Sequence, residues 1–327
     1  MTFVHDLSRP LREDRGGVVA IGNFDGVHRG HQAVLGRALD LARKRRGPAL
    51  VLSFEPHPRT LFKPDSPVFR LTPERDKARV LRALGFDRLA VLPFTRDVAA
   101  TSAEDFVLRY IVEGLGAAAV VTGYDFHFGA RRTGTPDRLR ELGREHGFAV
   151  QIVDAFADEG GALSSSRIRR LLGDGDVASA ADALGYRWNV SGTVEQGQQL
   201  GRTLGYPTAN IVPPPENRLA HGIYAVRFRF GDALHDGVAS FGRRPTIKEG
   251  APWLETHLFD FDGDLYGREA HVSLFGRLRG EERFASADAL VEQMHRDAAD
   301  ARAVLASAAP LSPLDRTLNF AAGADPS

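Results

Sequence analysis

The pattern of apolar residues changes near Leu184, and this change constrains the fold more than any other feature of the chain. Before it, short apolar runs alternate with helical stretches, which is typical of a parallel sheet with helices on both faces. Ligands of such sheets bind beyond the carboxyl ends of the strands. Thr72 and Ser102 are expected helix caps. The expected strands are 18–21, 49–54, 89–92, 117–122 and 149–153, and the expected helices are 32–46, 73–84, 103–113 and 137–146.

After Leu184 the chain consists of short alternating runs separated by turns, which predicts an antiparallel sheet or a small barrel. These runs are 189–194, 223–230, 236–239, 255–258 and 269–274. Ser286 is expected to cap one long helix over 287–307, and Pro310, Pro313 and Pro326 predict a loose arm from Ala308 onward. We therefore expect domains at 1–183 and 184–307, followed by a tail at 308–327.

Length and composition limit the classes of function. The 327 residues suggest two domains, and 42 Lys and Arg balance 42 Asp and Glu, which argues against a protein that coats nucleic acid or an anionic membrane. The absence of cysteine excludes disulfides, thiolate metal sites and cysteine nucleophiles. No run of 18 apolar residues occurs, and the first 17 residues are polar. We expect a soluble, cytoplasmic protein.

The strongest chemical signal is the string from Val18 to His31, VVAIGNFDGVHRGH. An apolar strand leads into a glycine-bearing loop, and His28 and His31 open a helix. Glycine permits close approach to a phosphate, and a helix start offers free N–H groups. Two histidines there can donate hydrogen bonds to phosphate oxygens. The alternative is a glycine-rich turn with two exposed histidines, but the whole string after a strand favours phosphate chemistry.

Three further segments follow predicted strands of the same half: 54–58, FEPHP; 123–129, GYDFHFG; and 164–169, SSSRIR. Each also has a structural interpretation. The phenylalanines could be core residues, the serines could cap a helix, and Arg167 and Arg169 could lie on a solvated face. Because all three segments follow strands, coincidence is a poor explanation, and we expect them to share one site.

In the second half, Thr208 and Asn210 offer oxygen ligands two residues apart after Pro207. Such oxygens, together with ATP phosphates, suit Mg²⁺. Glu255 lies in an apolar-flanked strand and could accept a proton from an attacking hydroxyl. The alternatives are turn chemistry for the first pair and an outward-facing strand residue for Glu255.

Together these segments resemble the bacterial bifunctional riboflavin kinase/FMN adenylyltransferases, the prokaryotic FAD synthetases. The His28-x-Gly30-His31 sequence resembles the signature of the wider nucleotidylyltransferase superfamily. The PTAN sequence at 207–210, GRRPT at 242–246 and LETHL at 254–258, followed by 260–267, resemble the family's kinase motifs. The resemblance extends over about residues 16–306. It implies a nucleotidylyltransferase-like α/β domain followed by a mainly antiparallel flavokinase barrel with a C-terminal helix.

The resemblance also implies two reactions and the residues that carry them. Riboflavin and ATP give FMN in the second domain, and FMN and ATP give FAD and pyrophosphate in the first, with Mg²⁺ in both. The implied catalytic residues are Glu255 as kinase base, and His28 and His31 at the transferring phosphate. Thr208 and Asn210 are the implied metal ligands. The implied substrate-binding residues are Gly22, Asn23, Phe24, Asp25, Gly30, Phe54, Pro56, Asp125, Phe128, Ser165, Arg167, Arg169, Gly205, Pro207, Thr208 and Asn210.

Three positions depart from the usual family pattern: Leu200 and His127 stand where arginine is common, and Ser240 where asparagine is common. The expected partners are riboflavin, FMN and ATP, without nucleic acid or membrane; a homo-oligomer is left open. One rival is an enzyme with a single activity whose other domain has become a flavin or nucleotide sensor. A second is a nucleic-acid-binding protein that uses the basic run 43–46, although cations at a helix end need no partner.

Overall fold

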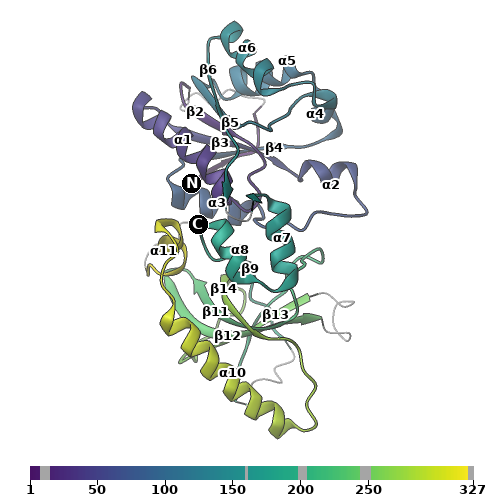
Figure 1. Cartoon of the computed structure of the whole chain (residues 1–327), viewed down its shortest axis with the longest axis vertical. Helices are drawn as coiled ribbons and strands as arrows, with labels where there is room; N and C mark the ends of the chain where they lie inside the picture. Colours follow the sequence, from purple (N-terminus) through teal and green to yellow (C-terminus); the bar gives the residue numbers. More distant parts are fainter. Residues whose placement is uncertain (8–14, 159–160, 198–204, 244–251, 323–327) are drawn as a thin grey trace. The chain divides into compact units, whose positions relative to one another are not determined.

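The computed structural model describes residues 1–7, 15–158, 161–197, 205–243 and 252–322. The chain divides into two compact units, the first spanning Met1–Ser164 and the second beginning at Ser165 (Figure 1). Within the described residues, no helix is long and apolar enough to cross a membrane.

The first unit is built on a parallel sheet with the strand order β1-β4-β3-β2-β5-β6. Its strands are β1 Thr2–Val4, β2 Val18–Ile21, β3 Ala49–Glu55, β4 Arg88–Pro93, β5 Ala119–Gly123 and β6 Ala149–Val153. Its helices are α1 Arg29–Arg45, α2 Pro58–Phe62, α3 Glu74–Leu84, α4 Arg96–Ala100, α5 Ala103–Phe106, the π-helix η2 Val107–Gly114, the 3₁₀ turn η3 Ala130–Arg132 and α6 Pro136–His146. A short hairpin joins β7 Ala157–Asp158 to β8 Gly161–Ala162. The expected α/β fold is confirmed.

The strand order reverses beside β2. From β2 the chain winds outward through β3 and β4, then crosses back to β5 on the other side of β2. All four residues of β2 are buried, as a central parallel strand covered on both faces requires. Ligands of open α/β sheets bind at such a reversal, at the carboxyl ends of the strands. The loop that leaves β2 is therefore placed for function.

The second unit contains α7 Ser165–Asp174, α8 Val177–Leu184 and an antiparallel sheet with the strand order β10-β13-β12-β11-β14-β9. The strands are β9 Asn189–Thr193, β10 Ala209–Ile211, β11 Gly222–Phe230, β12 Ala233–Arg243, β13 Pro252–Leu258 and β14 Glu269–Arg279. The Glu195 N–H donates to the Asn210 carbonyl at 2.8 Å and links the two edges of the sheet. The predicted barrel is thus confirmed and nearly closed. The long helix α10 spans Ala287–Ser307, and its apolar residues pack on the outer side of β11 and β12 (Figure 1).

The two helices before the barrel belong to the second compact unit, although the sequence boundary was expected at 183/184. Helix α8 packs on β14, and the Ala220 N–H donates to the Leu172 carbonyl of α7 at 3.0 Å. The change in apolar periodicity marks where the strands begin, whereas the compact unit includes the helices that cover them. A functional boundary at 183/184 stays a prediction.

The expectation of a loose arm from Ala308 is wrong for Pro313–Asn319, which form helix α11. Ser312 caps this helix and Pro313 occupies its first turn, so a residue counted as a helix breaker starts one instead. Asp315 is fully buried and pairs with Arg187. Arg227 donates to the Asn319 carbonyl at 3.0 Å. These contacts fix α11 to the barrel.

Candidate active sites

The loop between β2 and α1, residues 22–28, holds an uncommon backbone conformation. Phe24, Gly26 and Val27 have φ angles of 46°, 86° and 40°. Left-handed backbone is unfavourable for residues with a side chain, above all for a β-branched valine, and such strain collects at functional sites. The surrounding structure must therefore hold this loop in place.

Asp25 and Thr72 fix the β2–α1 loop through hydrogen bonds. The buried Asp25 carboxylate accepts hydrogen bonds from the backbone N–H of Leu71 at 3.3 Å and of Thr72 at 3.0 Å. The Gly26 N–H donates to the Thr72 hydroxyl at 2.8 Å. Thr72 is therefore not the N-cap expected from sequence, because α3 begins at Glu74 and the Thr72 side chain is engaged with the loop.

Two glycines of the motif make room for aromatic rings. A Cβ atom on Gly22 would lie 3.0 Å from the Phe24 ring, and one on Gly30 would lie 3.2 Å from the His28 ring. Each distance is tighter than ordinary van der Waals contact. The expected role of these glycines was close approach of a phosphate; the structure shows in addition that they leave room for the aromatic rings of the loop itself.

His28 and His31 stack on each other at the start of α1, with ring centroids 3.6 Å apart. His28 is the N-cap: its Nδ1 accepts a hydrogen bond from the His31 backbone N–H at 3.3 Å. An accepting Nδ1 places the proton of a neutral imidazole on Nε2. The cap thereby sets the tautomer that keeps an N–H donor on the far side of the His28 ring.

Burial keeps both rings neutral. It lowers the pKa of His28 to about 4, although the Asp25 carboxylate acts in the opposite direction. The pKa of His31 lies well below its ordinary value because of burial, with His28 and the Lys77 ammonium adding to the effect. At neutral pH the site therefore offers uncharged donors rather than imidazolium ions. Asn23 Oδ1 and His31 Nδ1 are buried without a hydrogen-bond partner in the described part of the chain.

This depressed pKa predicts a loss of stability in acid. The unfolded chain protonates His28 near pH 6.5, whereas the folded chain resists protonation until about pH 4. The unfolded state thus binds more protons over that range, so stability is complete above pH 6.5 and falls as the pH approaches 4. The expected loss from this ring is on the order of 3 kcal/mol. Asn can cap the helix but does not titrate, so His28→Asn should flatten the profile.

Urea unfolding measured by circular dichroism between pH 7.5 and 4 tests this prediction. Both tryptophans, Trp188 and Trp253, lie in the second unit, so their fluorescence reports that unit separately. The acid-sensitive transition should appear in the dichroism of the wild type and be reduced in His28→Asn. Equal pH slopes in the two proteins would contradict it.

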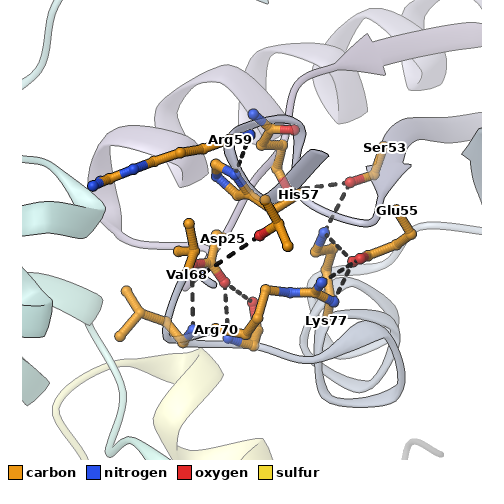
Figure 2. A network of polar contacts seen from close by, with 12 residues as sticks. Asp25, Ser53, Glu55, His57, Arg59, Val68, Arg70 and Lys77 are labelled. Atoms are coloured by element: carbon orange, nitrogen blue, oxygen red, sulfur yellow. Dashed lines mark hydrogen bonds and ion pairs between the residues drawn. The ribbon is translucent and has the colours of Figure 1, made fainter. Parts of the chain in front are cut away.

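A partly buried polar network lies beside the loop at the end of β3 (Figure 2). Glu55 accepts from Arg70 at 2.5 Å, and the Lys77 ammonium lies 3.5 Å from Glu55 and 2.9 Å from the Ser53 hydroxyl. The Ser53 hydroxyl in turn donates to the Asn23 carbonyl at 3.1 Å. We call Ser53, Glu55, Arg70 and Lys77 the Glu55 network. Sequence reasoning missed it; the one available signal was a lysine on the face of α3 that also carries Val80 and Leu81.

The aromatic residues near the loop separate into two groups. Phe54 and Phe128 are 7% and 5% exposed and belong to the hydrophobic core, which is the alternative that the sequence left open. Phe126 stacks on Phe128 with centroids 5.5 Å apart and is only partly buried. Phe62 on α2 is 68% exposed and meets Phe94 edge to face. Phe62 was not singled out from sequence, although it follows the FEPHP segment closely.

Pro56 and Asp125 lie at the carboxyl ends of β3 and β5, and both are exposed. Their placement is compatible with ligand contact, which stays a prediction. Ser165 begins α7 as expected, and Arg167 and Arg169 follow in its first turns. These three residues belong to the second compact unit, and their role as polyphosphate ligands also stays a prediction.

The second candidate site lies on the outer face of the barrel. Glu255 on β13 is paired across the sheet with Asn210 of β10 and Ser240 of β12. Directly opposed residues of antiparallel strands point to the same face. Leu254 and Thr256 alternate with Glu255 and are buried inside the barrel, so Glu255 faces outward beside Asn210. The structure thus brings the predicted base and one predicted ligand together.

Thr208 completes this face. Its hydroxyl lies 3.4 Å from Asn210 Oδ1, so two oxygen atoms converge there. A Cβ atom on Gly197 would lie 2.6 Å from Asn210 Nδ2, which shows how closely the neighbouring loop approaches this amide. The Pro207 carbonyl accepts from His257 Nδ1 at 3.0 Å and fixes the turn after Gly205. Leu200 and the motif residues Arg244, Pro245 and Thr246 lie outside the described residues.

The donor set favours a hard cation held by few protein groups. In the described part of the chain, no group of three His, Cys, Asp or Glu side chains could hold a metal. Hydroxyl and amide oxygens such as those of Thr208 and Asn210 suit Mg²⁺, which takes its other ligands from water and phosphates. These two residues therefore fit Mg²⁺ as two of its ligands.

Comparison with known proteins gives matches over both units. A family model described as FAD synthetase matches residues 11–167, and one described as riboflavin kinase matches residues 184–305. The bifunctional riboflavin kinase/FMN adenylyltransferase of Escherichia coli K12 is 41% identical over 300 residues, covering 91% of this chain and 95% of the relative. That of Pseudomonas fluorescens is 40% identical over 310 residues, covering 94% and 99%.

A solved structure agrees over the same length. A Streptococcus pneumoniae protein, titled a macrolide-efflux protein, matches with a TM-score of 0.81 and 30% identity, covering 94% of this chain and 99% of that one.

Proposed function

The chain belongs to the family of bifunctional riboflavin kinase/FMN adenylyltransferases, and we propose that the two sites described above divide its reactions between them. The protein phosphorylates riboflavin to FMN and adenylylates FMN to FAD. We assign adenylylation to the β2–α1 loop and phosphorylation to the outer barrel face. The observation that supports this division best is the separation of His28 and Glu255 into different compact units, each matched by its own family model.

Adenylylation needs positioning and charge stabilisation more than a protein nucleophile. The FMN phosphate attacks the α-phosphorus of ATP, and the bond to the leaving pyrophosphate breaks. We assign the Nε2–H of His28 and the imidazole of His31 to the oxygens that gain charge in this step. Neutral donors in a buried site need no reorganisation as that charge develops. Asn23 and Asp25 position the loop, and Phe62 offers an exposed ring for flavin packing.

Phosphorylation needs a base. The ribityl hydroxyl of riboflavin attacks the γ-phosphorus of ATP, and ADP leaves. Glu255 accepts the hydroxyl proton as the new P–O bond forms. Thr208 and Asn210 would hold Mg²⁺ against the ATP phosphates, where the ion neutralises charge that develops in the transfer.

Product analysis tests the two activities separately. Incubation with riboflavin, ATP and Mg²⁺ should yield FMN and then FAD by chromatography, and incubation with FMN, ATP and Mg²⁺ should yield FAD and pyrophosphate. A protein with a single activity, the first rival, would complete only one of these. Omission of Mg²⁺ should stop both reactions, and undiminished turnover in a chelator would contradict the metal assignment.

The compact units predict that the kinase is separable. A fragment that begins at Ser165 retains α7 and α8 on the barrel, so it should fold and convert riboflavin to FMN without forming FAD. A fragment that begins at Ala183 removes most of α8, which packs on β14, and should be less stable. Circular dichroism and FMN formation measure both. An unfolded Ser165 fragment would contradict independence of the units.

The remaining expectations stay proposals. The use of ATP supports a cytoplasmic location, and a homo-oligomer stays open. The nucleic-acid rival loses support, because the basic residues Arg43, Lys44 and Arg45 form the last turn of α1, where they complement the helix dipole.

A further inference from the structure

Lys77 is a charged group with an unusual position. Its side chain is 3% exposed, and it projects from α3 toward the end of β3 and the β2–α1 loop (Figure 2). Burial of an ammonium is costly unless it is paired and hydrogen-bonded. Here Glu55 and the Ser53 hydroxyl supply both contacts. The reactions as described make no use of this buried ion pair.

The contacts form a directed chain to the loop. The ammonium can only donate, so the Ser53 oxygen accepts from Lys77 and its hydroxyl proton points to the Asn23 carbonyl, at distances of 2.9 Å and 3.1 Å. Asn23 is followed at once by Phe24, the first left-handed residue of the loop. Glu55, which is held by Arg70, also contacts the ammonium at 3.5 Å. The hydroxyl orientation and the carbonyl position are therefore set from α3.

We propose that Lys77 is a positioning residue for FMN adenylylation, which fixes the β2–α1 loop through Ser53 and Asn23. In addition, its positive charge reinforces the effect of burial against protonation of His31. This inference rests on the assignment of adenylylation to that loop. It gives the Glu55 network a role in the reaction although none of its members is assigned to a substrate.

The effect of the Lys77 charge on the histidines depends on the charged groups around it. Lys77 faces Glu55 of β3, Asp25 of the loop and Arg70 of the segment before α3, and burial lowers its pKa against the opposing effect of Glu55. The Lys77 charge and the His28 ring both lower the pKa of His31, in addition to burial. A second cation on His31 would be opposed by the ammonium. Protonation of His28 Nδ1 would also remove the acceptor of the helix cap. Adenylylation should therefore be lost in acid, and the charge of Lys77 should shift that loss to lower pH.

Lys77→Met tests both parts, because methionine keeps the apolar length of the side chain and removes its charge and donors. The turnover number for FMN adenylylation should fall about 10- to 100-fold, as expected when a misplaced loop loses alignment. The acid limb of the pH–rate profile for this reaction should also move to higher pH, while the KM for ATP changes less than threefold. Lys44→Met, on the exposed end of α1, is the matched control and should behave as wild type. Riboflavin phosphorylation in the same samples should be unchanged.

Ser53→Ala separates the two parts. It breaks the hydroxyl link to Asn23 but keeps the ammonium, so turnover should fall about 3- to 10-fold while the acid limb stays in place. If Lys77→Met fails to fold by circular dichroism, Ser53→Ala decides, and wild-type turnover in it overturns the proposal. A folded Lys77→Met protein with wild-type turnover, or with reduced turnover but an unmoved acid limb, also overturns it. A wild-type protein that forms no FAD would instead refute the assigned function.

Discussion

Replacement of His28 by alanine should reduce FMN adenylylation by about 10²-fold or more and leave riboflavin phosphorylation intact, as removal of one charge-stabilising donor does elsewhere. His31→Ala should act in the same way, because the two rings stack and occupy one site. Steady-state rates with FMN and with riboflavin as separate substrates measure the two effects. Normal FAD synthesis in both variants would refute the site.

Two further variants distinguish chemistry from folding. His28→Asn can keep the helix cap but places no donor where Nε2–H lies, whereas His28→Gln can place an amide donor there but loses the cap geometry. If the donor carries the effect, the asparagine variant should be stable and inactive, and the glutamine variant less stable and partly active. An active asparagine variant and an inactive glutamine variant would show that the reaction requires only the helix cap.

Glu255→Gln should produce the complementary defect. Glutamine keeps the shape of the side chain but cannot accept the hydroxyl proton, so kinase turnover should fall by about 10²–10⁴-fold, the usual contribution of a general base. The apparent affinity for ATP should change little, since no phosphate contact is lost. Conversion of supplied FMN to FAD should persist. Glu282→Gln, an exposed carboxylate of the same unit, is the matched control.

Asn210→Ala should fail differently from Glu255→Gln, although the two residues are paired across neighbouring strands. Loss of the amide oxygen removes the proposed contact to Mg²⁺ and ATP, so the apparent affinity for both should weaken as turnover falls. Titration of each substrate separates the two variants. Unchanged kinase turnover in Glu255→Gln would remove the base, and loss of both reactions in either variant would indicate misfolding.

The sequence predicted those elements whose apolar pattern is long and regular. Strands such as Val18–Ile21 and the helix Ala287–Ser307 are found with the expected bounds. Burial of one or both faces of an element requires apolar residues at a regular spacing, which can be recognised in the sequence. The three-residue strand Ala209–Ile211 was missed, since three residues carry no measurable period. Its pairing with Glu255 became visible only in the barrel.

Within the site, local motifs predicted the histidines but not their support. Asp76 and Lys77 follow each other on a helix, a pattern that ordinarily marks a solvated face. Both are buried here, and Lys77 contacts Ser53 and Glu55, which are distant in sequence. Phe54 and Phe128 illustrate the opposite case. Each adjoins a motif, but a side chain beside a strand end can point to the ligand or to the core, and the sequence holds no information on which.

Helix α11 stabilises the kinase unit but lies outside the segment by which the kinase family is recognised. The matching family model ends at residue 305, whereas Asp315, the buried partner of Arg187, lies beyond it. Removal of one member of a buried ion pair leaves an uncompensated charge and costs about 3–5 kcal/mol. A substitution at Asp315 would therefore lower kinase activity in a cell by reducing the amount of folded enzyme. Purified protein that survived would show normal kinetics, so such a variant would be mistaken for an active-site defect unless abundance were measured.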